Sequence, residues 1–276
     1  VNILADNNDL GGKITAHPGI SKISFTGSTG TGAKVMESAA STLKRITLEL
    51  VGNDAGIVME DVNVDDVAPK IFDGAFGNNG QICIAMKRVY AHESIYDDLV
   101  AQLAKLADAA IVGNGLEQGT QLGPLQNKMQ FEKVKDYIED GRANGTIVAG
   151  GDVPEGKGYF IPPTIVRDID DSSRLVSEEQ FGPVLPIIKY SDVDDVIERA
   201  NNSEYGLGGS VWSSDLDKAY DVAKKVDSGT IWVNKHADLQ PHVPFGGIKT
   251  SGIGTELGAE GLHEFTQRKV INIAKA

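Results

Sequence analysis

The only cysteine of the 276-residue chain, Cys83, is its most reactive candidate side chain. It follows the segment Gly80-Gln81-Ile82 and precedes the basic residues Lys87 and Arg88. A cysteine thiolate attacks carbonyl carbon atoms when the thiol is accessible and a positive charge or a helix end lowers its pKa. A lone cysteine is otherwise a small apolar core residue. Both interpretations are open, because Lys87 and Arg88 can equally point to solvent.

The carboxylate of Glu49 is the second candidate, at the end of the apolar stretch Ile46-Thr47-Leu48. It can activate water as a general base, bind a ribose, or be a structural acid at a strand end. The ribose role follows from its place roughly 20 residues after a glycine-rich turn, where a dinucleotide-binding fold often has such an acid. A base beside a cysteine nucleophile also predicts cofactor-free hydrolysis of activated esters.

The glycine-rich turn runs from Gly27 to Gly32, between an expected strand at 22–26 and an expected helix at 33–40. Glycines in this position let backbone N–H groups approach phosphate oxygens at the N-terminus of the helix. The order of these glycines does not match the Gly-x-Gly-x-x-Gly fingerprint of dinucleotide-binding folds. Phosphate binding and an ordinary turn are therefore both open.

Five segments, in this order along the chain, resemble motifs of the aldehyde dehydrogenase superfamily. They are Phe25-Thr26-Gly27-Ser28-Thr29, Thr47-Leu48-Glu49-Leu50-Val51-Gly52, Phe76-Gly77-Asn78-Asn79-Gly80-Gln81-Ile82-Cys83, Glu179-Gln180-Phe181-Gly182-Pro183-Val184, and Pro244-Phe245-Gly246-Gly247 followed by Lys249 and Ser251-Gly252. One such segment is weak support, but five in register are specific. The match corresponds to about the second half of that family's chain.

The resemblance implies oxidation of a small-molecule aldehyde to a carboxylic acid with NAD or NADP. Cys83 would attack the aldehyde carbonyl to give a thiohemiacetal, and its backbone N–H would stabilise the oxyanion. Hydride transfer to the nicotinamide would leave a thioester, and Glu49 would activate the water that hydrolyses it. We prefer this role for Glu49 to ribose binding, because Glu179 is then available for the ribose.

The same resemblance assigns the remaining site residues. Ser28 would contact the pyrophosphate of the dinucleotide, with Gly27 and Leu50 also at the cofactor. Glu179 and Phe181 would hold the nicotinamide ribose and ring; without the family they would be a surface acid and a core phenylalanine.

The substrate side of the site is expected to be partly apolar. The resemblance places Ile82, Ile84 and Phe245 around the aldehyde. His236 and His242 lie in the loop before Phe245, but no third ligand at metal spacing accompanies them, so we expect no metal site.

Two departures from the family pattern bear on activity. Val51 stands where the family has a glycine, and Asn53 where it usually has a lysine. A β-branched residue does not easily adopt positive φ and adds bulk where the family has only backbone near the nicotinamide. Val51 is therefore expected to hinder cofactor placement or movement of Glu49. The family's upstream elements, which supply a second oxyanion donor and bind adenosine, have no counterpart here. We therefore expect this chain alone to oxidise aldehydes poorly or not at all.

Composition excludes several functional classes. Apolar residues make up 41% of the chain and charged residues 24%, as in globular proteins. The net charge of −13 argues against nucleic acid or an anionic membrane as a partner. No stretch reaches the roughly 20 apolar residues of a membrane span, and residues 1–12 do not resemble a signal peptide. A single cysteine forms no intrachain disulfide, which fits a cytoplasmic location.

The order of expected elements predicts an α/β fold. Expected strands lie at 22–26, 44–50, 55–59, 88–92, 146–149, 164–167, 184–190, 209–212, 230–233 and 269–274. Expected helices lie at 33–40, 64–78, 128–144, 193–201, 216–226 and 259–266, with one more after Ser94 as N-cap. Cys83 is expected in or just after the last turn of the helix at 64–78. Such alternation favours a parallel-rich sheet covered by helices.

We divide the chain into three parts. Residues 1–50 are expected to be the remnant of a dinucleotide-binding domain, with an open sheet edge. Residues 51–247 are expected to form the catalytic α/β domain. Residues 248–276 are expected to form a C-terminal helix and a strand that pairs across a subunit interface, which predicts a homo-oligomer. A non-catalytic fragment that only assembles with itself or a partner is the remaining alternative.

Overall fold

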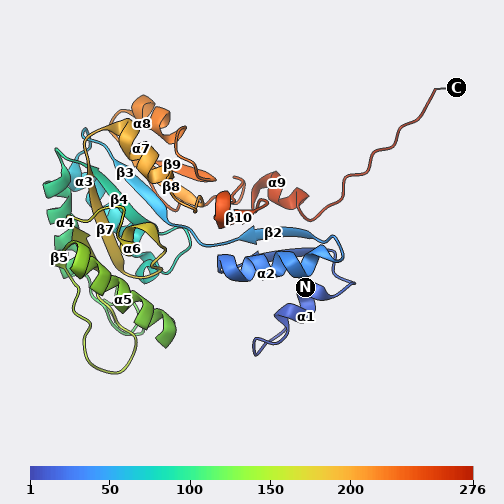
Figure 1. Cartoon of the computed structure of the whole chain (residues 1–276), viewed down its shortest axis with the longest axis horizontal. Helices are drawn as coiled ribbons and strands as arrows, with labels where there is room; N and C mark the ends of the chain where they lie inside the picture. The colour runs from blue at the N-terminus through green and yellow to red at the C-terminus, as the bar shows by residue number, and fades with distance from the viewer. Residues whose placement is uncertain (276) are drawn as a thin grey trace.

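The computed structural model describes residues 1–275 and contains two sheets (Figure 1). The larger sheet has seven strands. In spatial order they are β5 (Thr146–Ala149), β6 (Thr164–Arg167), β7 (Val184–Tyr190), β4 (Met86–His92), β3 (Asp54–Val58), β8 (Gly208–Trp212) and β9 (Thr230–Val233). All neighbouring pairs are parallel except β5 with β6. The predicted parallel-rich α/β fold is therefore confirmed.

Helices cover both faces of the larger sheet. One face carries α3 (Val64–Phe76) and α4 (Tyr96–Ala109). The other carries α5 (Lys128–Asn144), α6 (Arg174–Ser177), α7 (Val193–Asn201) and α8 (Leu216–Ala223). Successive side chains of β3 alternate between the two cores: Ile57 packs on the α5 side and Val58 on the α3 side. Burial on both faces explains the nearly continuous apolar sequences of these strands.

The smaller sheet positions Glu49. It consists of β1 (Lys22–Thr26) parallel to β2 (Arg45–Glu49), with β10 (Gly252–Ile253) antiparallel to β2. The helix α2 (Thr29–Ala40) covers it through a small core that includes Ile23, Val35 and Leu48, and α1 (Gly11–Ala16) lies beside α2 (Figure 1). Residues 50–53 connect β2 directly to β3 of the larger sheet. Glu49 therefore lies where the chain leaves one sheet for the other.

The segment that carries Cys83 differs from expectation. The helix α3 ends at Phe76 and not at residue 78, because Asn78 and Asn79 adopt positive φ angles of 50° and 60°, which a right-handed helix cannot continue. They belong to a short 3₁₀ segment, Gly77–Gly80. Cys83 follows in a separate turn before β4, and not at the end of the helix.

The observed ends of other helices also differ from the expected ones. The helix α2 starts earlier than expected, because Ser28 caps it, and α8 ends at Ala223 instead of 226. The N-cap of α4 is Ile95; the Ser94 hydroxyl lies 2.8 Å from Nδ1 of His92 and caps nothing. The α9 helix (Gly258–His263) follows a short 3₁₀ turn, Lys249–Ser251, and ends before the expected 266.

The C-terminal residues leave the body of the molecule (Figure 1). Residues 269–274, expected as a strand, have no strand partner within residues 1–275 and form no regular element. A strand needs a neighbour to satisfy its backbone groups, and the described residues supply none for this segment. Within the same described residues, no helix is long and apolar enough to cross a bilayer.

Candidate active site

Cys83 lies half-buried in an apolar cluster between the two sheets. Ile82, Ile84 and Phe245, the three residues predicted for the aldehyde pocket, belong to this cluster. Leu207 and Trp232, which the motifs did not indicate, also line it. The structure thus brings the predicted nucleophile and the predicted apolar residues together.

Lys87 lies beneath the Cys83 turn and is only 2% exposed. Its ammonium donates hydrogen bonds to the carbonyl oxygens of Ile82 at 3.0 Å, Cys83 at 2.6 Å and Ala85 at 3.3 Å. Arg88, the other basic residue near the cysteine, instead donates to the backbone carbonyls of Asn53 and Ala200, which are not part of the turn. Lys87 is therefore the cation that contacts the nucleophile segment, and it does not point to solvent.

The thiol of Cys83 is not yet activated. Burial raises its pKa above the ordinary value, whereas the charge of Lys87 and a hydrogen bond from the backbone of Ile84 lower it. The negative charges of Asp54 and Glu49 raise the pKa of the thiol further. Because the net change is upward, the thiol is mostly protonated at neutral pH in this conformation.

The backbone of the turn presents a free donor. Its carbonyls point toward Lys87, and within residues 1–275 the Cys83 N–H has no backbone acceptor. A free N–H on the nucleophile's own residue is what stabilisation of an oxyanion requires. The structure is therefore compatible with the oxyanion role expected for this group.

Glu49 ends β2 between Thr26 of β1 and Gly252 of β10 and is 4% exposed. Within residues 1–275 neither of its carboxylate oxygens has a hydrogen-bond partner. Burial, with a smaller contribution from the charge of Glu256, raises its pKa to about 8. Buried carboxyl groups without partners are costly and are concentrated at functional sites. Oε1 of Glu49 lies 3.6 Å from the position that a Cβ of Gly246 would take, and Gly246 follows Phe245 of the Cys83 cluster.

Val51 does not strain the backbone, because its φ is not positive. The expected hindrance of cofactor placement or of Glu49 movement by this side chain stays a prediction. Gly52 is the tightly packed residue: an added Cβ would lie 2.9 Å from the Cys83 carbonyl oxygen and 2.9 Å from Cβ of Leu207. The segment after Glu49 and the Cys83 turn are therefore packed directly on each other.

Glu179 lies inside the protein and not on an open surface. Its Oε1 accepts a hydrogen bond from the Gly52 N–H at 3.2 Å and lies 3.7 Å from Nζ of Lys87. Burial raises the pKa of Glu179, and the Lys87 charge opposes that effect. Phe181 is half-buried with a φ of 48°, and its carbonyl accepts from the Gln130 side chain at 2.9 Å. In this conformation Gly52 and Lys87 engage Oε1 of Glu179.

The glycine-rich turn has one open face. Ser28 is exposed at the N-cap of α2, where its side chain accepts from the Thr31 N–H. Nothing lies within 4 Å of the position that a Cβ of Gly30 would take. The first turn of α2 can therefore admit a phosphate.

The other two residues predicted at the cofactor have structural roles in this conformation. The Gly27 N–H is already donated to the Glu49 carbonyl at 3.0 Å. Leu50 is buried beneath α2, where a Cβ on Gly32 would come within 2.6 Å of its side chain. Of Ser28, Gly27 and Leu50, Ser28 is the one with an exposed polar side chain.

His236 and Asp54 form a polar pair next to the turn that the motifs did not indicate. Nε2 of His236 donates to the Ile84 carbonyl at 2.8 Å, and Nδ1 lies 3.0 Å from the Ser210 hydroxyl. Burial lowers the pKa of His236 to about 4, so the ring is neutral. Asp54 Oδ2 is 4.0 Å from Nε2, and burial raises the pKa of Asp54 to about 7. Both nitrogens of His236 are thus engaged with protein groups.

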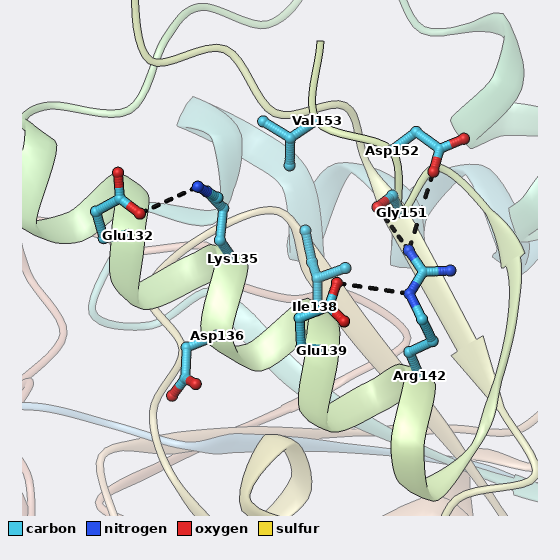
Figure 2. A pocket seen from close by; sticks show the side chains of 9 residues that line it. All are labelled: Glu132, Lys135, Asp136, Ile138, Glu139, Arg142, Gly151, Asp152 and Val153. Atoms are coloured by element: carbon cyan, nitrogen blue, oxygen red, sulfur yellow. Dashed lines mark hydrogen bonds and ion pairs between the residues drawn. The ribbon is translucent and has the colours of Figure 1, made fainter. Parts of the chain in front are cut away.

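A hollow lies away from this site, between α5 and residues 151–153 (Figure 2). Its volume is about 480 Å³, and it shares no residue with the Cys83 cluster. Its cations are already paired: Lys135 with Glu132 at 3.1 Å, and Arg142 with Glu139 at 3.5 Å. The hollow offers solvated ion pairs and no group with unusual chemistry.

Comparison with known proteins agrees with these features. The model of the aldehyde dehydrogenase family matches residues 1–271. The mitochondrial aldehyde dehydrogenase of Leishmania tarentolae is 44% identical over 266 residues, which are 96% of this chain and 53% of the relative. Aldehyde dehydrogenase 1A1 of Bos taurus is 43% identical over 95% of this chain and 53% of its own length.

Solved structures give the same result. The NAD+ complex of aldehyde dehydrogenase from Bacillus cereus has a TM-score of 0.89 at 41% identity, covering 92% of this chain and 52% of that one. An NADP-dependent enzyme of E. coli has a TM-score of 0.91 at 32% identity, covering 95% and 55%. The chain thus spans about half the length of the relatives it matches. From its sequence and its fold, this chain belongs to the aldehyde dehydrogenase family.

Proposed function

We propose that Cys83 and Glu49 are the nucleophile and the general base in oxidation of an aldehyde to a carboxylic acid. The observation that carries this proposal is their joint environment. Cys83 lies in an apolar cluster suited to an aldehyde, and this cluster includes Phe245. The buried Glu49 has no partner within residues 1–275, and its Oε1 lies 3.6 Å from the position that a Cβ of the adjacent Gly246 would take. The named activities of the relatives support the same chemistry.

The residues divide the reaction between them. The thiolate of Cys83 adds to the carbonyl carbon, and the Cys83 N–H faces the negative charge that develops on the oxygen. After the substrate loses hydride, a thioester joins the acyl group to Cys83. Glu49 then takes a proton from water, which attacks the thioester and frees the acid. With a pKa of about 8, Glu49 is a stronger base than an ordinary carboxylate and is partly ionised near neutral pH.

We propose NAD or NADP as the cofactor, whose nicotinamide accepts the hydride when bound. The support is the named cofactors of the structural relatives and the open first turn of α2 with Ser28 at its cap. At the nicotinamide end, Gly52 and Lys87 already engage Oε1 of Glu179. For this reason, and because the smaller sheet has only three strands within residues 1–275, we propose that this chain alone turns over slowly.

The test is NADH formation by the purified chain with a small panel of aldehydes, followed by absorbance. The expected result is slow formation that disappears in Cys83→Ala, with both proteins folded by circular dichroism. Equal rates in the two proteins would refute the nucleophile. A rate on the order of 10 s⁻¹, ordinary for enzymes, would refute the impaired turnover.

Assembly and location belong to the same proposal. Exposed Val270, Ile271 and Ile273 in the C-terminal segment support pairing with a second copy, and hence a homo-oligomer. A cytoplasmic location rests on the single cysteine, although one relative is named as mitochondrial.

A further inference from the structure

We propose that Lys87 is a positioning residue for Cys83: its buried ammonium holds the carbonyl side of the nucleophile turn and keeps a positive charge beside the thiol. This inference rests on the proposed function, since it assumes that Cys83 is the nucleophile. It gives a role to Lys87, which lies outside the five family motifs, and to the inward orientation of Glu179.

The hydrogen bonds of Lys87 use all of its donors. An ammonium has three N–H groups, and three carbonyls, those of Ile82, Cys83 and Ala85, lie within 3.3 Å. With its carbonyls fixed on one side, the turn keeps the Cys83 N–H free on the other. Because the side chain is 2% exposed, water cannot replace these bonds without local unfolding. Lys87 therefore determines the orientation of the peptide groups on both sides of the thiol.

The positive charge of Lys87 favours the Cys83 thiolate, whereas the nearby carboxylates disfavour it. Asp54 on β3 and Glu49 on β2 both disfavour the Cys83 thiolate, and no other cation acts on the thiol among the principal influences. His236 is neutral and held by the Ile84 carbonyl.

Glu179 opposes this effect of Lys87. Its Oε1 lies 3.7 Å from Nζ of Lys87, so the two charges attract in a buried environment. A carboxylate at this distance offsets part of the positive potential that Lys87 exerts on the thiol. When Glu179 turns away or is neutralised, the ammonium acts on Cys83 with less opposition. The inward Glu179 therefore keeps the nucleophile less reactive, and its release favours the thiolate.

The test is the rate of Cys83 alkylation by iodoacetamide between pH 5 and 10, read by intact mass. Because Cys83 is the only cysteine, every adduct of this reagent on a thiol is assigned to it. The comparison is between Glu179→Gln and the double variant Lys87→Met with Glu179→Gln. Neither leaves an unpaired buried carboxylate at position 179, so the pair isolates the ammonium.

The double variant should react about tenfold more slowly at pH 7, with an apparent thiol pKa about one unit higher. Glu179→Gln alone should react faster than the unmodified chain. The matched control is Lys133→Met with Glu179→Gln. Lys133 donates to the Glu179 carbonyl at 2.9 Å but does not contact the turn. This control should behave as Glu179→Gln does.

Coincident pH profiles of Glu179→Gln and the double variant would overturn the proposal, even if the double variant unfolds more easily. A merely structural lysine would lower the unfolding temperature and leave the thiol pKa in place. If Lys87→Met does not fold, Lys87→Gln with Glu179→Gln keeps a hydrogen-bond donor without the charge, and the same comparison decides. Absence of alkylation at every pH, in every form, would instead refute the proposed nucleophile.

Discussion

Replacing Glu49 with glutamine should change how the stability of the protein depends on pH. Burial raises the pKa of Glu49 from an ordinary 4.5 to about 8. Between these values the folded protein binds a proton that the unfolded chain releases, so stability falls as pH rises. At 1.36 kcal/mol per pKa unit, the loss reaches up to about 5 kcal/mol once Glu49 is ionised. Glu49→Gln removes this dependence, whereas the contributions of Asp54 and Glu179 remain in both proteins.

The assay is urea unfolding at pH 5 to 9, with the free energy of unfolding extrapolated to water at each pH. The unmodified chain should lose up to about 1.4 kcal/mol more per pH unit than Glu49→Gln, mainly between pH 5 and 8. The control is Glu132→Gln, because Glu132 is exposed and its ion pair within residues 1–275 is with Lys135. Parallel curves for the unmodified chain and Glu49→Gln would show that the carboxyl is solvated and would refute its assignment as a buried base.

Three further predictions concern Asp54, Gly52 and the C-terminal segment. Asp54→Asn should speed alkylation of Cys83 above pH 7, because the Asp54 carboxylate raises the thiol pKa; an unchanged rate would contradict that coupling. Gly52→Ala should cost about 1–3 kcal/mol in urea unfolding and slow alkylation, since the new methyl group meets the Cys83 carbonyl and Leu207; a neutral effect would show that the turn yields freely. Removal of residues 269–275 should reduce the mass in solution by light scattering without lowering the unfolding temperature, and an unchanged mass would place the self-association elsewhere.

Local sequence patterns predicted most of the elements. The helix at Lys128–Asn144 and the strand at Val184–Tyr190 have the predicted limits, because a capping Asn127 and a run of buried apolar residues are local signals. The end of α3 was missed, since consecutive left-handed asparagines have no clear signal in one sequence. The strand at 269–274 was expected from its composition, but no partner strand lies within residues 1–275.

The sequence predicted which residues belong to the site better than it predicted their surroundings. Motifs indicated Cys83 and Glu49. The structure places Glu49 at the end of β2 in the smaller sheet and Cys83 in the turn before β4 of the larger sheet. The inward orientation of Glu179 could not be predicted, because its partners Gly52 and Lys87 are far from it in sequence. The burial of Lys87 beside Glu179 was missed for the same reason. The same holds for His236, whose partner Ile84 is 152 positions away.

The central claim, that Cys83 carries an acyl group which Glu49 helps to release, is tested most directly by trapping that group. The chain and its Glu49→Gln variant would be mixed with nitrophenyl acetate, which needs no cofactor, and quenched over time for peptide mass analysis. We predict acetylation at Cys83 in both proteins and a longer-lived acetyl group in Glu49→Gln. Absence of acetyl on Cys83, or equal lifetimes in the two proteins, would contradict the account.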